Sequence, residues 1–176
     1  MSIGDSYGGG IVAYILVSGD PGYIDDGKQR GLIAAVANIS AGIVWHATQT
    51  GTTGATGTAL GTGSSNTDAI IALHGAENNA ATISRNYSAA GDGGLGDWFL
   101  PSKDELWKLY LNRAAIGGFV SGRYWSSTEY SSSSAWFVYF TFGTVDKFGK
   151  DFAFPVRCVR NFTYLAAATG NFFRLF

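Results

Sequence analysis

The part of this sequence that most restricts its fold is an aromatic-rich segment enclosed by two short motifs. The segment runs from Tyr124 to Arg160; it opens with Tyr-Trp-Ser-Ser-Thr-Glu and closes with Pro-Val-Arg-Cys-Val-Arg. Nine of the 25 residues from 130 to 154 are aromatic, whereas the whole 176-residue chain has 5 Trp, 9 Tyr and 12 Phe. Side chains alternate between the two faces of a β-strand, so this segment predicts strands that carry large rings on both faces.

Strand alternation divides the middle of this segment into two sets. The sets are Trp136, Val138 and Phe140 on one face, and Phe137, Tyr139 and Thr141 on the other. The first set suits a protein core. One possibility is that the second set is buried as well, because continuous apolar runs are typical of strands covered on both sides. The other is that it forms an exposed surface of aromatic and hydroxyl-bearing side chains, which antibody binding sites also use. We favour the exposed surface. The framework beneath it is then expected to consist of Trp125, Trp136, Val138, Phe140, Val156 and Val159.

Charge and composition exclude several classes of protein. Charged residues make up 14% of the chain, the net charge is −1 and no basic block is present. A nucleic-acid-binding protein needs a basic face, so we expect no nucleic-acid partner. The single cysteine excludes an internal disulfide. No run of about 18 apolar residues occurs and no signal peptide opens the chain as given, so we expect no membrane insertion.

The other segments predict a loop-rich fold with both strands and helices. Buried strands are expected over Tyr7–Val17, at Gly31–Val36 and at Gly42–Trp45. The tail from Asn161 to Phe176 is apolar and aromatic, which predicts a last strand or a packed extension. The low-complexity stretch Gly51–Ser65 predicts a mobile linker, with a loop that reaches over a ligand as the alternative.

Three helices are predicted. Asn66, Thr67 and Asp68 can cap a helix that begins near Ala69, and a second helix or its continuation is expected over Glu77–Tyr87. The clearest signal is a capping box formed by Ser102 and Glu105. The apolar positions that follow it at helical spacing are Leu106, Leu109 and Tyr110, and Gly117–Gly118 ends that helix.

No motif in the chain predicts catalysis, a metal or a cofactor. Gly91–Gly96 matches GxGxxG but lacks the strand before it and the helix directly after it. Gly143–Lys150 resembles a P-loop but has one residue too many between its glycines. His46 and His74 have no metal-ligand spacing and are expected to be structural or surface residues. Cys158 is expected to be buried and inert, so we expect the protein not to be an enzyme.

Several rare strings occur in an order that resembles one known family. They are YGGGIVAYI, GLIAA, GIVWH, GDWFLPSKDEL, IGGF, YWSSTE, AW and VRCVR. Together they resemble the C-terminal domain family of the Legionella collagen-like adhesin, also called DUF1566, over roughly Ile3 to Arg160. The resemblance implies an α+β domain with a C-type lectin-like fold of the formylglycine-generating-enzyme subtype. It implies two helices, small irregular antiparallel sheets and a single ligand-binding domain over residues 1–176.

Some members of this family are variable proteins of diversity-generating retroelements, which scatter Asn-type codons in a C-terminal region. The resemblance therefore implies a non-enzymatic display protein with a variable region at about 124–160, on a virion or cell surface, that binds a protein or glycan ligand. Such codons yield Phe, Tyr, Ser, Thr and Asp but not Lys or Trp. Trp136, Lys147 and Lys150 are thus expected to be scaffold. The candidate ligand-binding positions are Tyr130, Ser132, Phe137, Tyr139, Thr141, Phe142, Thr144, Asp146, Phe148, Asp151, Phe152 and Phe154.

Two alternatives remain open. One is a fixed-sequence adhesin module that binds a polysaccharide or a surface protein. The other is an enzyme of the formylglycine-generating type, which the single cysteine does not favour. Calcium-dependent sugar binding is not implied, because the chain contains neither Glu-Pro-Asn nor Gln-Pro-Asp.

Overall fold

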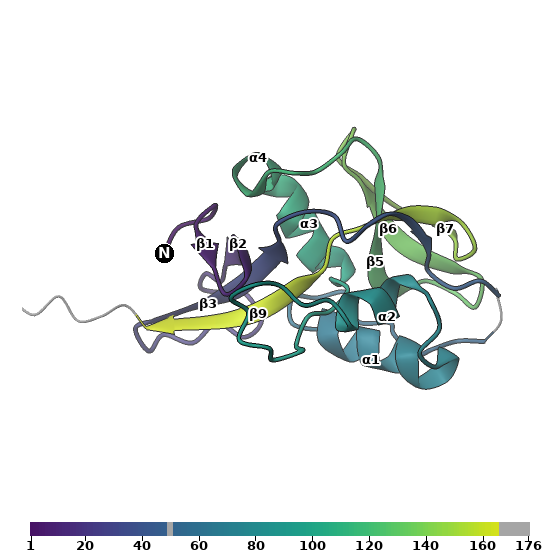
Figure 1. Ribbon diagram of the computed structural model, residues 1–176, viewed down its shortest axis with the longest axis horizontal. Coiled ribbons are helices and arrows are strands. Elements are labelled where there is room, and N and C mark those ends of the chain that lie inside the picture. Colours follow the sequence, from purple (N-terminus) through teal and green to yellow (C-terminus); the bar gives the residue numbers. More distant parts are fainter. Residues whose placement is uncertain (49–50, 166–176) are drawn as a thin grey trace, which may run out of the picture.

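Three small antiparallel sheets and four helices make up residues 1–48 and 51–165, the part of the chain that this computed structural model describes (Figure 1). In chain order the elements are β1 (Ser6–Tyr7), β2 (Gly10–Ile15), β3 (Lys28–Ala35), β4 (Ser40–Val44), α1 (Gly63–His74), α2 (Ala80–Arg85), α3 (Lys103–Leu111), α4 (Arg113–Ile116), β5 (Arg123–Glu129), β6 (Ser134–Tyr139), β7 (Thr144–Gly149), β8 (Ala153–Val156) and β9 (Val159–Leu165). The α+β class is as predicted, with four helices in the described residues where the resemblance implied two.

The first sheet brings the two ends of the described chain together. Its strand order is β1-β2-β3-β9, and Ala34 of β3 pairs with Val159 of β9. The strand expected over Tyr7–Val17 is instead a β1–β2 hairpin, because Gly8 and Gly9 adopt positive φ angles of 54° and 82° that reverse the chain.

The other predicted strands fall within observed strands. The segment Gly31–Val36 lies largely in β3, Gly42–Trp45 largely in β4, and the tail from Asn161 begins in β9. Residues 166–176 of that tail lie outside the described residues.

Helix α3 lies between the first sheet and the three-stranded sheet β5-β6-β7 (Figure 1). Leu106 and Leu109 of α3 are fully buried in one cluster with Leu32 of β3 and with Tyr124 and Val138 of the three-stranded sheet. This shared core fixes where the three-stranded sheet stands relative to the rest of the molecule.

The start of α3 confirms the predicted capping box. The Ser102 side chain accepts a hydrogen bond from the Glu105 backbone N–H, and the Glu105 carboxylate accepts one from the Ser102 backbone N–H at 2.7 Å. Glu105 is fully buried and also accepts a hydrogen bond from the Gly61 N–H at 2.8 Å. The cap therefore ties the segment that precedes α1 to α3 as well as closing the helix end.

The predicted start of the first helix is wrong. Helix α1 begins at Gly63, so Asn66 and Thr67 lie inside it rather than at its cap. The Asn66 side chain is buried and bonds the backbone of Gly57, accepting from its N–H at 3.1 Å and donating to its carbonyl at 2.6 Å. A residue suited to capping is used here to hold the loop before the helix. The second predicted helix is confirmed as α2, which Asn79 caps.

The mobile linker expected over Gly51–Ser65 is also wrong. Residues 51–62 form a strap whose backbone groups are bound by distant side chains. The Thr53 N–H donates to the Glu129 carboxylate at 2.9 Å, and the Ser102 hydroxyl donates to the Ala59 carbonyl at 2.9 Å. The buried side chains of the strap are those of Ala55 and Leu60. Low complexity did not prevent order, because other elements supply the hydrogen bonds that the strap cannot make itself.

None of the helices in the described part of the chain is long and apolar enough to cross a membrane.

Candidate functional site

The three-stranded sheet β5-β6-β7 carries most of the predicted site residues. Residues directly opposite each other in antiparallel strands project from the same face. The register places Arg123, Tyr139 and Thr144 in one row of such residues, Trp125, Phe137 and Asp146 in the next, and Glu129, Ala135 and Phe148 in the third, all on one face. The other face carries Tyr124, Val138 and Val145, and beyond them Trp136 and Lys147. Tyr124 and Val138 are the residues that pack toward α3.

The centre of the first of these faces is covered by strand β8. The Phe154 ring lies 4.4 Å from Trp125 and 5.6 Å from Phe137, measured between ring centroids. Phe137 and Phe154 are 5% and 7% exposed, so the prediction that they belong to an exposed surface is wrong. Alternation assigned Phe137 to the correct face of its strand, but the β4-β8 sheet, whose strands come from distant parts of the chain, packs over that face.

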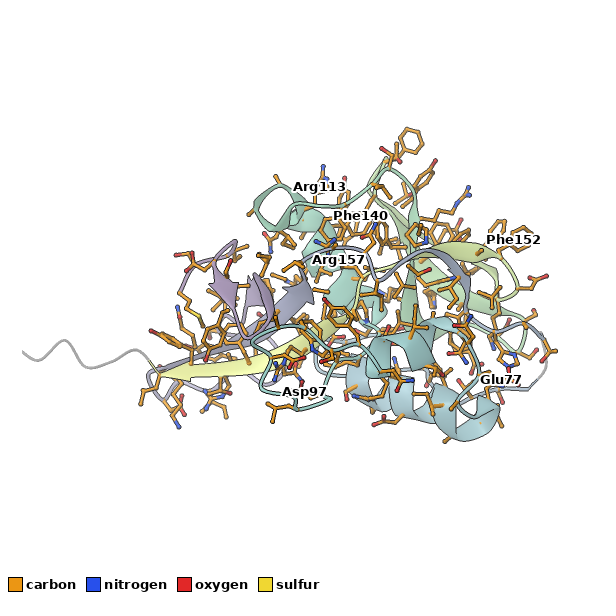
Figure 2. All side chains as sticks on the ribbon, in the orientation of Figure 1. Glu77, Asp97, Arg113, Phe140, Phe152 and Arg157 are labelled. Carbon is orange, nitrogen blue, oxygen red and sulfur yellow. The ribbon has the colours of Figure 1, made fainter. Side chains whose placement is uncertain are left out.

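The rings around this covered centre remain accessible. Phe142 is 70% exposed and Phe152 is 51% exposed, and Tyr139 and Phe148 are half-buried beneath them. Tyr139 contacts Phe142 edge-on at 4.9 Å, and Phe148 contacts Phe152 edge-on at 4.6 Å. Figure 2 shows Phe152 at the outer edge of the molecule, beside β7. We define the aromatic face as Arg123, Tyr139, Phe142, Asp146, Phe148 and Phe152.

Arg123 lies beside two rings of this face, Tyr139 and Phe148. Its guanidinium carbon is 5.0 Å from the centroid of Tyr139, 5.4 Å from Phe148 and 5.5 Å from Phe137. Its Nε is buried without a hydrogen-bond partner. Sequence reasoning did not identify Arg123, because it lies one residue before the Tyr-Trp-Ser-Ser-Thr-Glu motif and belongs to none of the patterns.

The predicted positions do not all gather on one patch. Tyr130 lies on the opposite side with Trp136, whose ring it meets edge-on at 5.3 Å, and the Lys147 Nζ is 4.7 Å from the Tyr130 centroid. Trp136 is only half-buried, so its assignment to the core framework is wrong. The other five framework residues are buried: Trp125, Val138, Phe140, Val156 and Val159.

Ten of the twelve candidate positions are accessible. Those that are exposed are Tyr130, Ser132, Thr141, Phe142, Thr144, Asp146, Asp151 and Phe152, and those that are half-buried are Tyr139 and Phe148. Whether any of them binds a ligand stays a prediction.

A buried ion pair supports the segment from below. The Lys150 Nζ lies 2.5 Å from a Glu129 carboxylate oxygen and 3.0 Å from the Ser132 carbonyl, and both charged side chains are almost fully buried. The pair joins the end of β5, the β5–β6 turn and the end of β7, while Glu129 also binds the strap at Thr53. Lys150 was predicted to be scaffold, but no local pattern pairs it with a carboxylate 21 residues away.

The two histidines lie together near this pair without forming a metal site. His46 and His74 stack with their ring centroids 3.4 Å apart, and the His46 Nε2 is 3.4 Å from the Glu77 carboxylate. Burial, with the charges of His46 and Lys150, lowers the pKa of His74. No group of three or more His, Cys, Asp or Glu that could hold a metal occurs within residues 1–48 and 51–165.

Cys158 is fully buried, as expected, beside the first sheet. Burial raises the pKa of its thiol well above the usual range. A thiolate is the reactive form of cysteine, so this residue is chemically inert in the fold.

Comparison with known proteins agrees with the motifs quoted above. The sequence model of the Lcl C-terminal domain family matches residues 34–160, which is more than two thirds of the 176-residue chain. The match begins later than the resemblance, which reached back to Ile3. No curated protein matches the chain. The matched region contains every element from β4 to β8, the aromatic face and the Glu129–Lys150 pair, and the chain therefore belongs to the Lcl C-terminal domain family.

Proposed function

We propose that this chain is a ligand-binding display domain with a C-type lectin-like fold, and that a diversity-generating retroelement diversifies its C-terminal surface. The protein makes and breaks no covalent bond and needs no cofactor. Its ligand is a protein or a glycan, and its setting is the surface of a virion or a cell.

The observation that carries this proposal is the exposure of large rings beside small polar side chains on the aromatic face. Phe142 and Phe152 keep more than half of their surface in water. Clustered apolar side chains in water mark interaction sites, because covering them releases free energy. Thr144 and Asp146, exposed on the same side of β7, add a hydroxyl and a carboxylate for hydrogen bonds.

The support beneath this face favours recognition by a preorganised surface. Lys150 and Glu129 hold the ends of β5 and β7, and the covered centre packs Phe137 and Phe154 against Trp125. Side chains on a rigid frame lose little conformational entropy on binding, which raises the affinity they can give.

The pattern of exposure also limits which positions are free to vary. The ten accessible candidates have residue types that adenine mutation of Asn-type codons can yield. Phe137 and Phe154 are buried, and polar residues at these two positions would disrupt the core. The proposed variable set therefore excludes them.

The burial of Cys158 argues against the formylglycine-generating alternative. That chemistry uses reactive cysteines, and this thiol is both inaccessible and held protonated.

A genomic comparison tests the diversification. The expected result is a near-copy of the coding stretch for residues 124–160, differing mainly at adenines, beside a reverse transcriptase gene. The differences should fall on the ten accessible positions and spare Phe137 and Phe154. If neither the copy nor the gene is present, the diversification is refuted. Closely related chains that keep Phe142 and Phe152 unchanged would instead favour a fixed-sequence adhesin.

A further inference from the structure

Arg123 is the one arginine in the described part of the chain whose side chain makes no hydrogen bond or ion pair. The other arginines of residues 1–48 and 51–165 all donate to protein acceptors; they are Arg30, Arg85, Arg113, Arg157 and Arg160. Arg157 and Arg160 also have a buried Nε without a hydrogen bond, but their Nη atoms bind carbonyl oxygens. Arg123 therefore differs from the other described arginines because none of its side-chain nitrogens, rather than Nε alone, has an acceptor in the protein.

The rings around Arg123 hold its guanidinium in place but offer it no hydrogen-bond acceptor. Four rings lie within 5.7 Å of its guanidinium carbon, those of Phe137, Tyr139, Phe148 and Phe154. Ring contacts of this kind contribute about 0.5–2 kcal/mol, but they do not replace hydrogen bonds to the five N–H donors. The group stays charged, because an arginine does not lose its proton in a protein. An acceptor from a partner would meet a cation that is already oriented and partly dehydrated.

The charges around Arg123 favour a ligand with a single carboxylate over a polyanionic ligand. Asp146 lies on the same face and Asp151 is exposed in the following turn. The lysine of the same sheet, Lys147, projects from the opposite face toward Tyr130 and Trp136. A sulfated polysaccharide or a nucleic acid would be repelled by the two aspartates and would find one cation. A lone carboxylate can form a paired, charge-assisted contact with the guanidinium.

The neighbouring rings favour a protein over a sugar as the source of that carboxylate. The side chains of Phe142, Phe148 and Phe152 have no polar atom, so the part of a ligand that covers them gains most by being apolar, and sugar hydroxyls would find side-chain partners only at Tyr139, Thr144 and Asp146. Aliphatic and aromatic side chains of a protein would instead gain from burial against the same rings.

We propose that the aromatic face binds a partner protein that inserts an aspartate or glutamate carboxylate against Arg123 and packs apolar side chains on Phe142 and Phe152. This inference rests on the proposed ligand-binding function and specifies the chemistry of the ligand.

The test starts from phage-displayed random peptides selected on the immobilised protein. A recovered peptide is synthesised, and its Kd is measured by calorimetry for the wild type, Arg123→Gln and Lys147→Gln. The two variants remove the same charge from opposite faces of one sheet, and thermal unfolding confirms that both are folded. We expect peptides with an acidic residue next to aromatic or aliphatic ones. The Kd should rise about tenfold or more in Arg123→Gln and change less than about twofold in Lys147→Gln.

A second arm identifies the carboxylate. Replacing the acidic residue of the peptide by its amide should weaken binding to the wild type and cause no further loss in Arg123→Gln, because the two changes remove one interaction. Arg123→Lys should recover only part of the affinity, since a lysine keeps the charge but not the paired geometry.

The outcomes separate this inference from the proposed function. Peptides that lose affinity in Phe142→Ser and Phe152→Ser but not in Arg123→Gln would refute the carboxylate and leave the binding face intact. Peptides indifferent to all three changes, or a selection that yields no binder, would count against both. Binding of immobilised heparin or sialyllactose that depends on Arg123, without acidic peptides, would overturn the assignment to a protein partner.

Discussion

Arg157 and Arg123 stand near the two ends of the aromatic-rich segment, and they show two uses of one side chain beside aromatic rings. Arg157 is 1% exposed, lies over Phe119 and donates to the carbonyls of Val36, Gly117 and Gly118. Figure 2 shows it in the middle of the molecule. Arg123 has rings around it but no acceptor. The first guanidinium joins loops into a framework, whereas the second is held for an acceptor from outside.

The same contrast runs through the whole segment. The closing motif, residues 155–160, has its charged groups buried and bonded, whereas the hairpin of β6 and β7 presents rings to water. Substitutions on the framework should therefore change stability, and substitutions on the aromatic face should change binding alone.

The largest effect is expected at the buried ion pair. Lys150→Met should lower the free energy of unfolding by about 3–5 kcal/mol, because it leaves the Glu129 carboxylate buried without its cation. Lys147→Met, an exposed lysine of the same hairpin, should change it by less than about 0.5 kcal/mol. Adding Glu129→Gln to Lys150→Met should recover part of the loss, since the amide carries no charge. Urea unfolding measures all three, and equal losses in the two lysine variants would contradict the assigned framework role.

A smaller difference should separate two phenylalanines that the sequence treats alike. Phe137→Ala should cost about 3 kcal/mol through loss of burial and a cavity beside Trp125 and Phe154. Phe152→Ala should cost less than about 0.5 kcal/mol, because its ring is half in water. Denaturant midpoints compare the two proteins directly. A large loss in Phe152→Ala would mean that the aromatic face belongs to the core.

The smallest expected effect is the contribution of His74 to the pH dependence of stability. Its folded-state pKa lies below the usual 6.5, so between the two pKa values the unfolded chain binds more protons than the folded one. Stability should therefore fall as the pH drops below 6.5, toward the folded-state pKa. The charged groups that act on the ring are His46 and Lys150, which lower its pKa, and Glu77 and Glu129, which raise it.

Thermal unfolding of the wild type and His74→Gln at a series of pH values tests this linkage. Titrating groups that do not interact with His74 contribute equally to both proteins, so the difference between the two slopes reports His74 together with the charged groups that act on it. Identical pH dependence would exclude a contribution from His74.

Local signals in the sequence are sufficient to predict some helices and strands but insufficient to predict the candidate binding site. The capping box at Ser102 depends on residues three apart, and it was predicted correctly. Alternation also placed Phe137 and Tyr139 on one face of β6, as the register confirms. It could not show that β8 would cover Phe137 and leave Tyr139 at the edge, because that depends on a strand from another sheet.

The strap of residues 51–62 was mispredicted for a related reason. Its composition is that of a flexible linker, but Glu129, Asn66 and Glu105 bind its backbone from distant positions. Arg123 was missed because only the structure shows that its side chain has no hydrogen-bond acceptor within the protein.

The Lys150–Glu129 pair has a consequence for diversification itself. Both lysine codons are rich in adenine, so a process that mutates adenines across this segment would strike the Lys150 codon as readily as its intended targets. Each chain that loses this cation keeps a buried, uncompensated carboxylate and loses about 3–5 kcal/mol of stability, so fewer of these chains reach the folded state. A retroelement acting here would therefore produce fewer functional receptors than distinct sequences, and the folding of each new chain would act as the first selection before any ligand is met.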